Sequence, residues 1–316
     1  MKYYIGIDGG GSKTIFAISD ENGKVLGTVS AGSAFYKQIG EDGVIDLLRN
    51  GITEVCRFAE GDVTNIASVC FGMPAWGESP VRDKVIEEKI ISTFPEWNIH
   101  IVNDCEVGWA GSLELSPGIN IVAGTGSIAF GKNEQGDTAR CGGWSEWFSD
   151  EGSGYWLGMK CVQLFSRQSD GRDQCGPLYE IVKTELNLSE DEEIIDLFEK
   201  EYLHQRDKIA SLQKLLLRAA NEGDVYAIKA YAQAARELYD IVCGVRKKIF
   251  PERSCLVSCS GGIFKVGDLI RSPFRKLLEA DDMELTQPKA EPYEGAVLMA
   301  KYYENESMLR VRTDCH

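Results

Sequence analysis

The sequence predicts an α/β protein of two related lobes, with a mixed sheet in the first. Its 316 residues are about twice the length of a typical single domain, so two domains are expected. Strands alternate with helices over residues 2–103. An apolar strand, a glycine turn and a returning strand then occur a second time, which favours two lobes of related design that face one another.

Periodicity assigns the elements of the first part of the chain. Alternating residues and the Asn22-Gly23 hairpin signal indicate strands, apolar residues at helical spacing indicate helices, and short apolar runs indicate buried strands. The expected order is strands Tyr3–Asp8, Thr14–Ser19 and Val25–Ser30, helix Asp42–Phe58, strand Ile66–Phe71, helix Val85–Phe94 and strand Ile99–Asn103.

The second part is expected to be mostly helical around a smaller set of strands. The expected order is strands Asn120–Ala123 and Ile128–Gly131, helices Ala210–Ala220 and Val225–Phe250, strand Cys255–Ser260, and helices Phe264–Leu278 and Glu294–Tyr303.

Composition narrows the class of partner. With 49 acidic and 34 basic residues the chain carries a net charge of -15, which disfavours nucleic acid and anionic membranes. No apolar run reaches the roughly 18 residues of a membrane span, and the N-terminus lacks a signal peptide, so a cytoplasmic protein is expected. Ten cysteines without a CxxC pair favour thiols over disulfides or metal ligands.

The first glycine turn, Gly9–Lys13, is the sharpest feature of the chain. It leads into a strand, whereas the P-loop and the dinucleotide fingerprint both open a helix, so neither motif applies. A phosphate would be held by the amides of Gly10 and Gly11, the Ser12 hydroxyl and the Lys13 ammonium. The alternative is a plain hairpin that needs positive φ, but three consecutive glycines exceed that need.

Two later turns carry the same signal more weakly. The second glycine turn, Gly124–Ser127, offers Thr125, Gly126 and Ser127 to phosphates, and two such turns could clamp one triphosphate from opposite lobes. Gly261 and Gly262 follow a strand where a nucleotide ring could lie on exposed backbone. A plain hairpin and a tight strand-to-helix turn, respectively, remain the alternatives.

Two carboxylates are expected at strand ends, where ligands collect in open α/β sheets. Phosphoryl transfer to an alcohol needs a metal, donors around the phosphates and a carboxylate that accepts the hydroxyl proton. Asp8 suits a Mg²⁺ ion, directly or through water, and Asp104 suits the base. The alternative for Asp104 is an N-cap of a helix over Glu106–Leu113.

The aromatic segment, Gly142–Gly158, combines glycines, tryptophans and the adjacent acids Asp150 and Glu151. A sugar packs its C–H face on aromatic rings and donates hydroxyls to acids, which suits such a segment. The alternative is an aromatic core with a helix cap at Ser149 or Asp150.

With these motifs in this order, the sequence resembles the BadF/BadG/BcrA/BcrD-type ATPases and, within them, the N-acetylglucosamine kinase branch of the actin/Hsp70/sugar-kinase superfamily. The resemblance covers essentially the whole chain. It rests on matches at Asp8–Thr14, Asn103-Asp104, Gly124–Ser127, Gly142–Trp144 with Asp150–Ser153, Ser260–Gly262 and Glu294–Ala296.

The resemblance implies two ribonuclease-H-like lobes of the actin-like ATPase kind, with a nucleotide cleft between them. The lobes would comprise residues 1–116 with 292–316, and residues 117–291. It further implies that sugar contacts come from Asp104, Gly143, Trp144 and Asp150, that Asp104 accepts the proton of the 6-hydroxyl, and that Ser12 and Thr125 contact ATP phosphates. The Ser260–Gly262 match implies the adenosine site.

One departure concerns the acceptor. Those kinases usually carry a sugar-binding Asn after the third strand, where an alignment without gaps to Gly40 places Phe35. The residues before Asp150 are Trp147-Phe148-Ser149, without the usual Gly. A different sugar or another acceptor therefore stays open.

The sequence thus favours a kinase that uses ATP and Mg²⁺ to phosphorylate the 6-hydroxyl of N-acetylglucosamine, glucosamine or a related amino sugar. The alternatives are an ATPase activator of a radical-type acyl-CoA dehydratase or reductase, and a nucleotide-dependent sensor without turnover. A small-molecule sugar is the expected partner, and a homodimer stays open.

Overall fold

The computed structural model describes residues 1–59, 65–251 and 253–313. The chain forms two compact units, an N-terminal unit of Met1–Ser116 with Gln287–His316 and a C-terminal unit of Pro117–Thr286. The chain returns to the N-terminal unit at Gln287, earlier than the residue 292 expected from the sequence. Residues 314–316 of that expected segment lie outside the described residues.

The N-terminal unit is built on a five-stranded sheet of order β3-β2-β1-β4-β5. Strands β1 to β3 are antiparallel neighbours, and β1, β4 and β5 run parallel. The strands are β1 (Tyr3–Gly9), β2 (Thr14–Ser19), β3 (Val25–Ala31), β4 (Ile66–Met73) and β5 (Ile99–Asn103).

The C-terminal unit repeats this topology in a second five-stranded sheet of order β10-β9-β6-β7-β8. The antiparallel and parallel pairs fall at the same places as in the first sheet. Its strands are β6 (Gly118–Ala123), β7 (Ser127–Lys132), β8 (Thr138–Gly142), β9 (Cys255–Ser260) and β10 (Met283–Thr286). The edge strands β8 and β10 were not expected, because they are short and mix polar with apolar residues.

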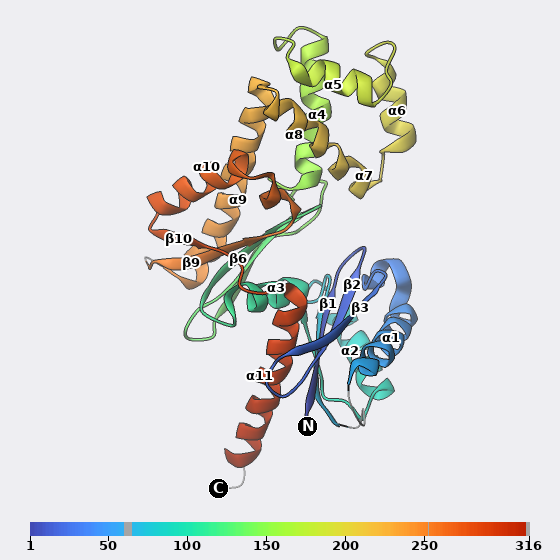
Figure 1. The fold of residues 1–316 in the computed structure, drawn as a ribbon, viewed down its shortest axis with the longest axis vertical. Coiled ribbons are helices and arrows are strands. Elements are labelled where there is room, and N and C mark those ends of the chain that lie inside the picture. Colours follow the sequence, from blue (N-terminus) through green and yellow to red (C-terminus); the bar gives the residue numbers. More distant parts are fainter. Residues whose placement is uncertain (60–64, 252, 314–316) are drawn as a thin grey trace. The chain divides into compact units, whose positions relative to one another are not determined.

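Helices cover both faces of the N-terminal sheet (Figure 1). The side chains of Tyr3, Ile5 and Ile7 enter a core shared with α1 (Tyr36–Val55) and α2 (Pro80–Thr93). Alternation along β1 turns Tyr4, Gly6 and Asp8 to the other face, where α3 (Asp104–Leu113) and α11 (Pro292–Thr313) pack. Asp8 therefore belongs to the face that carries α3.

Helix α1 begins earlier than the period predicts. Gly40 interrupts it with φ 72° and ψ 170°, so the regular helix resumes close to the predicted start at Asp42. The predicted end at Phe58 falls in a 3₁₀ turn, Cys56–Phe58. The predicted helix therefore covers only the part of α1 after the kink.

Helix α11 returns the end of the chain to the first sheet through close backbone contacts. A Cβ at Gly6 would lie 2.6 Å from the Tyr293 carbonyl, and one at Gly111 of α3 would lie 2.5 Å from the Glu291 carbonyl. A Cβ at Gly295 would collide with the backbone of α3 at Val107 and Gly111. Glycine at these positions lets α11 lie directly against β1 and α3.

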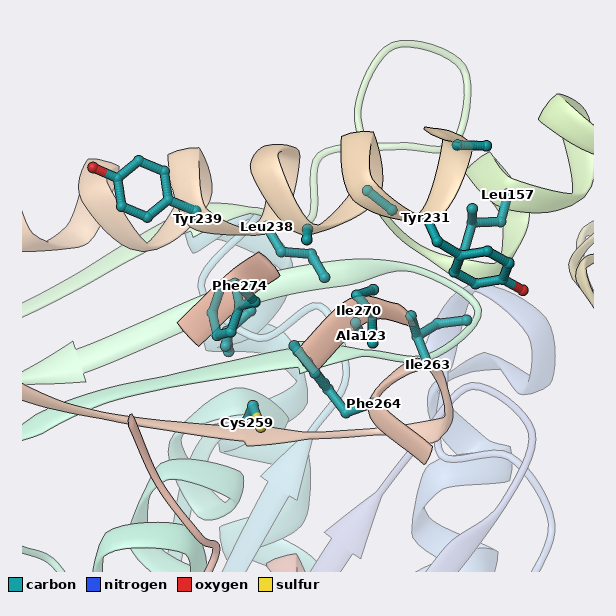
Figure 2. Packing of buried hydrophobic residues seen from close by; sticks show 14 of the residues in the cluster. Ala123, Leu157, Tyr231, Leu238, Tyr239, Cys259, Ile263, Phe264, Ile270 and Phe274 are labelled. Carbon is teal, nitrogen blue, oxygen red and sulfur yellow. The ribbon is translucent and has the colours of Figure 1, made fainter. Parts of the chain in front are cut away.

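The C-terminal unit carries helices α4 (Gly154–Ser169), α5 (Pro177–Glu185), α6 (Glu193–Glu201), α7 (Arg206–Ser211), α8 (Gln213–Asn221), α9 (Val225–Ile249) and α10 (Asp268–Ala280). Its core gathers side chains from the sheet, α9 and α10, and Figure 2 shows Leu238, Phe274, Cys259 and Ala123 in it. In the part of the chain that the structure describes, no helix is long and apolar enough to cross a membrane.

Two helices differ from prediction in this unit. The helix predicted over Phe264–Leu278 is a 3₁₀ helix, Gly262–Val266, followed by α10, because Gly267 between them has φ 89°. The helix predicted over Ala210–Ala220 is divided at Leu212 into the end of α7 and α8. Apolar residues recur at helical spacing across both breaks, so periodicity did not register them.

Candidate active site

The first glycine turn joins β1 to β2, and its Gly10 amide donates to the Lys13 carbonyl at 2.9 Å. None of Gly9, Gly10 and Gly11 has a positive φ. The alternative of a plain hairpin that needs positive φ is therefore wrong. A Cβ at Gly9 would lie 2.6 Å from the Gly72 carbonyl, and one at Gly10 would lie 2.8 Å from the Lys13 carbonyl. A Cβ at Gly11 would meet nothing within 4 Å, so packing does not require a glycine there. The close approach of a ligand to the backbone would require one.

Asp8 ends β1 directly before this turn and is partly buried. Burial raises the pKa of Asp8 to about 6, Glu291 adds to the rise, and Lys13 acts against it. Lys13 therefore offsets the negative charge of the Asp8 carboxylate only in part. A carboxylate oxygen in this environment fits a hard cation such as Mg²⁺. Among the described residues no group of three or more His, Cys, Asp or Glu could hold a metal, so a Mg²⁺ ion here would take its other ligands from phosphates and water.

Asp104 is the first residue of α3, and Asn103 is the N-cap. The Asn103 side chain accepts from the Cys105 amide at 3.1 Å, and the Glu106 carboxylate accepts from the Asn103 amide at 3.3 Å. This is a capping box, so the alternative of Asp104 as the cap is wrong. The Asp104 carboxylate is partly buried and is not the group that starts the helix.

The strand register brings Asp8 and Asp104 to the same edge of the sheet. Asp8 lies opposite Gly72 of β4, and Asn103 lies opposite Met73 of the same strand. One strand therefore separates the two carboxyl ends, which places their backbones about 10 Å apart. Gly72 between them has no side chain, and Val107 of α3 fills the space at 2.6 Å from its Cβ position.

The second glycine turn joins β6 to β7 and is closed by a hydrogen bond of 2.9 Å from the Gly124 amide to the Gly126 carbonyl. A Cβ at Gly124 would meet nothing within 4 Å. Thr125 is partly exposed and its hydroxyl donates to the Asp207 carboxylate at 3.1 Å. Ser127 is buried and its hydroxyl donates to the Glu151 carbonyl at 2.7 Å, so Ser127 holds the turn in shape.

Asp150 is buried, and its carboxylate has protein partners. Oδ1 accepts from the Ser127 amide at 3.2 Å, and Oδ2 accepts from the Arg206 guanidinium at 2.5 Å. The residue has φ 62°, a left-handed backbone that non-glycine residues seldom adopt. The structure thus adds Arg206 and Asp207 of α7, which sequence reasoning missed because no local pattern marks them.

Three rings of the aromatic segment are exposed, those of Trp144, Trp147 and Phe148, whereas Tyr155 is buried and Trp156 packs against the core. Trp144 is 74% exposed and Phe148 is 73% exposed, so the alternative of an aromatic core is wrong for them. Gly143 before them has φ 67°. The alternative of a cap at Ser149 or Asp150 is also wrong, because α4 starts after Ser153, whose hydroxyl accepts from the Trp156 amide at 3.2 Å. Exposed rings in the same segment as a carboxylate suit a carbohydrate.

The last predicted turn follows β9. Gly261 has φ 98° and its Cβ position is filled by the backbone of Ala123, so backbone geometry accounts for this glycine. Gly262 is exposed, and a Cβ there would meet nothing within 4 Å. Of these two glycines, Gly262 is therefore the one that packing does not explain.

Phe35 is the N-cap of α1 and supplies no capping side chain. Its ring meets Tyr36 edge-on at 6.0 Å, and the Lys37 ammonium lies 5.5 Å from its centre. A cavity of about 490 Å³ opens beside it, lined by Tyr36, Lys37, Glu78, Ser79 and Arg82. The Phe35 ring thus lies near the Lys37 ammonium, which pairs with Glu78 at 3.2 Å.

Two units of one strand order, each with a glycine turn between its first two strands, define the fold class of sugar kinases and actin-like ATPases. The family model of the BadF/BadG/BcrA/BcrD ATPase family matches residues 5–300. The chain belongs to this family.

Curated relatives match over nearly the full chain. An N-acetylmuramic acid/N-acetylglucosamine kinase of Clostridium acetobutylicum is 32% identical over 95% of this chain and 99% of its own. An N-acetyl-D-glucosamine kinase of Dictyostelium discoideum is 30% identical over 94% of this chain and 97% of its own.

Two solved structures share the fold. A Chromobacterium violaceum protein proposed to be an N-acetylglucosamine kinase matches with a TM-score of 0.75, at 23% identity over 95% of this chain and 99% of that chain. A ROK family glucokinase of Streptomyces griseus, in complex with glucose and AMPPNP, matches with a TM-score of 0.55, at 16% identity over 95% and 99%.

Proposed function

We propose that the protein is a kinase that transfers the γ-phosphoryl group of ATP to the 6-hydroxyl of an amino sugar. The observation that carries this proposal is the place of Asp104. It follows β5 at the same sheet edge as Asp8 and the first glycine turn, and Asn103 takes over the capping of α3. The names of the Clostridium and Dictyostelium relatives support an amino-sugar acceptor.

In the proposed reaction, Asp104 accepts the proton of the sugar hydroxyl while its oxygen attacks the γ-phosphorus. The bond from that phosphorus to the bridging oxygen breaks, and ADP leaves. The Gly11 amide, the Ser12 hydroxyl and Lys13 would hold phosphates in the first turn, and Thr125 and Gly126 in the second. The Gly10 amide, expected from the sequence to bind phosphate, donates instead to the Lys13 carbonyl and shapes the turn. Bound Mg²⁺ would neutralise phosphate charge, and Asp8 is the residue that would hold it.

For the acceptor, we propose that Gly143, Trp144 and Asp150 bind the sugar ring. The exposed Trp144 ring offers an apolar face, and the Asp150 carboxylate offers hydrogen-bond acceptors. Gly261 and Gly262 would receive the adenosine. The alignment to Gly40 puts Phe35 where the kinases of the resemblance usually carry an Asn, so we expect a sugar preference that differs from theirs.

Nuclear magnetic resonance of the product tests this function most directly. Purified protein with ATP and Mg²⁺ is assayed for ADP release with N-acetylglucosamine, glucosamine, N-acetylmuramic acid and glucose. N-Acetylmuramic acid is included because the Clostridium relative carries its name. We expect an amino sugar to be turned over and the ³¹P signal to couple to the protons of C6. A rate of ADP release that none of the sugars raises above the rate without sugar would contradict the proposal.

A further inference from the structure

The start of α7 contacts two predicted subsites of the C-terminal unit at once. Arg206 donates to Asp150, the expected sugar ligand, at 2.5 Å. The next residue, Asp207, accepts from the hydroxyl of Thr125, the expected phosphate ligand, at 3.1 Å. Consecutive residues of one helix therefore hold one group from each subsite.

These contacts are tightly packed. The Arg206 guanidinium fills the place that a Cβ of Gly126 would occupy, and both Asp150 oxygens lie within 2.9 Å of that place. The Asp150 side chain is 2% exposed, whereas that of Arg206 is 43% exposed. The pair therefore differs from an ordinary surface ion pair, because removing Arg206 leaves a buried carboxylate with one amide donor.

Helix α7 is also fixed to α4, whose first turns form the end of the aromatic segment. Gly158 of α4 has no room for a Cβ, because the Ile209 carbonyl of α7 occupies that space. The Gly154 amide at the start of α4 donates to the Gly124 carbonyl at 2.8 Å, and the Tyr155 amide donates to the Thr125 carbonyl at 3.1 Å. A displacement of α7 would therefore move the second glycine turn.

We propose that Arg206 and Asp207 are positioning residues that orient the acceptor carboxylate and the nucleotide turn from one helix end. Arg206 fixes the orientation of the Asp150 carboxylate, the proposed sugar ligand. Asp207 holds Thr125 so that the turn meets the nucleotide phosphates. This inference rests on the proposed function, and it assigns roles outside the sequence motifs.

The test compares Michaelis constants of four variants with the wild-type enzyme. R206Q is expected to raise the KM for sugar about 10- to 100-fold and the KM for ATP much less, because a charged hydrogen bond to Asp150 is lost. D207A is expected to raise the KM for ATP about 10-fold and the KM for sugar much less. R206K and D207N, which keep a donor and an acceptor, should recover part of each loss.

R218Q is the matched control. Arg218 of α8 pairs with Glu185 at 2.6 Å and with Glu222 at 3.1 Å, and its side chain is 50% exposed. Its removal should leave both Michaelis constants unchanged. Thermal unfolding of every variant establishes that each is folded.

The inference is overturned if R206Q behaves like R218Q, or if R206Q and D207A raise both constants equally. A wild-type enzyme that turns over no sugar contradicts the proposed function instead. In that case calorimetry with AMPPNP tests the role of Asp207. Weaker binding of AMPPNP by D207A supports the inference, and unchanged binding overturns it.

Discussion

The guanidinium of Arg206 occupies the space that a side chain at Gly126 would need, and the Asp150 carboxylate borders the same space. A Cβ at Gly126 would therefore force these side chains to shift, a packing role that neither the phosphate reading nor the plain hairpin reading of the sequence included. A methyl group at this position would push Arg206 away from Asp150.

G126A is thus expected to lower the free energy of unfolding by about 1–3 kcal/mol, the usual cost of overpacking. G124A is the matched control, because a Cβ at Gly124 meets nothing within 4 Å and should leave stability nearly unchanged. Urea unfolding of the two variants measures the difference. Equal stability of G126A and G124A would show that the turn adapts without displacing Arg206.

The capping box of α3 makes a second stability prediction. N103A removes the acceptor of the Cys105 amide and should cost about 0.5–2 kcal/mol. N103D keeps that acceptor and loses the bond of 2.6 Å from Asn103 Nδ2 to the Trp76 carbonyl, so it should recover part of the loss. Chemical denaturation checks both, and an N103A protein as stable as the wild type would contradict the cap assignment.

Trp144 is exposed enough for function to be separated from stability. W144A should raise the KM for the sugar about 10-fold through lost stacking, while the melting temperature stays unchanged. W147A is the comparison, because Trp147 is 63% exposed and lies edge-on to His204 at 5.7 Å. If W144A and W147A have the same small effect on KM, Trp144 does not bind the acceptor.

The contact between the chain's two ends gives a pH prediction. Glu304 of α11 accepts from Lys2 at 2.6 Å and from the Tyr4 hydroxyl at 2.7 Å. Burial acts to raise the pKa of Glu304, but the bonds from Lys2 and Tyr4 outweigh it and hold the pKa below the usual 4.5. A carboxyl with a lower pKa in the folded state stabilises the fold fully above about pH 4.5, and this stabilisation is lost as pH falls through the folded value.

E304Q should therefore flatten the fall in unfolding free energy below pH 4.5, relative to the wild type. Denaturant unfolding at pH values between about 3 and 7 measures the free energy of unfolding of E304Q and of the wild type as a function of pH. Parallel curves for the two proteins would contradict the role given to Glu304.

Much of the fold followed from local pattern, and the site followed only in part. The β1 and β2 strands alternate clearly, so the first glycine turn was predictable at its observed place. Strands β8 and β10 were missed because edge strands of four or five residues carry little alternation. The capping box was present in the residues from Asn103 to Glu106, but the only cap considered from the sequence was Asp104, as the alternative to its role as the base.

The partners of the site depend on tertiary structure. Arg206 is 56 positions from Asp150 and Asp207 is 82 positions from Thr125, so spacing along the chain gives no sign of either contact. Likewise, nothing in the sequence tells that Gly9 and Gly10 serve packing while Gly11 does not.

The most direct test of the account is the turnover number of D104N at saturating ATP and amino sugar. Asn keeps the size of the side chain and cannot accept the hydroxyl proton. We predict that kcat falls about 10²- to 10⁴-fold, with the affinity for AMPPNP and the melting temperature unchanged. Turnover of D104N at the wild-type rate would contradict the assignment of Asp104 as the base.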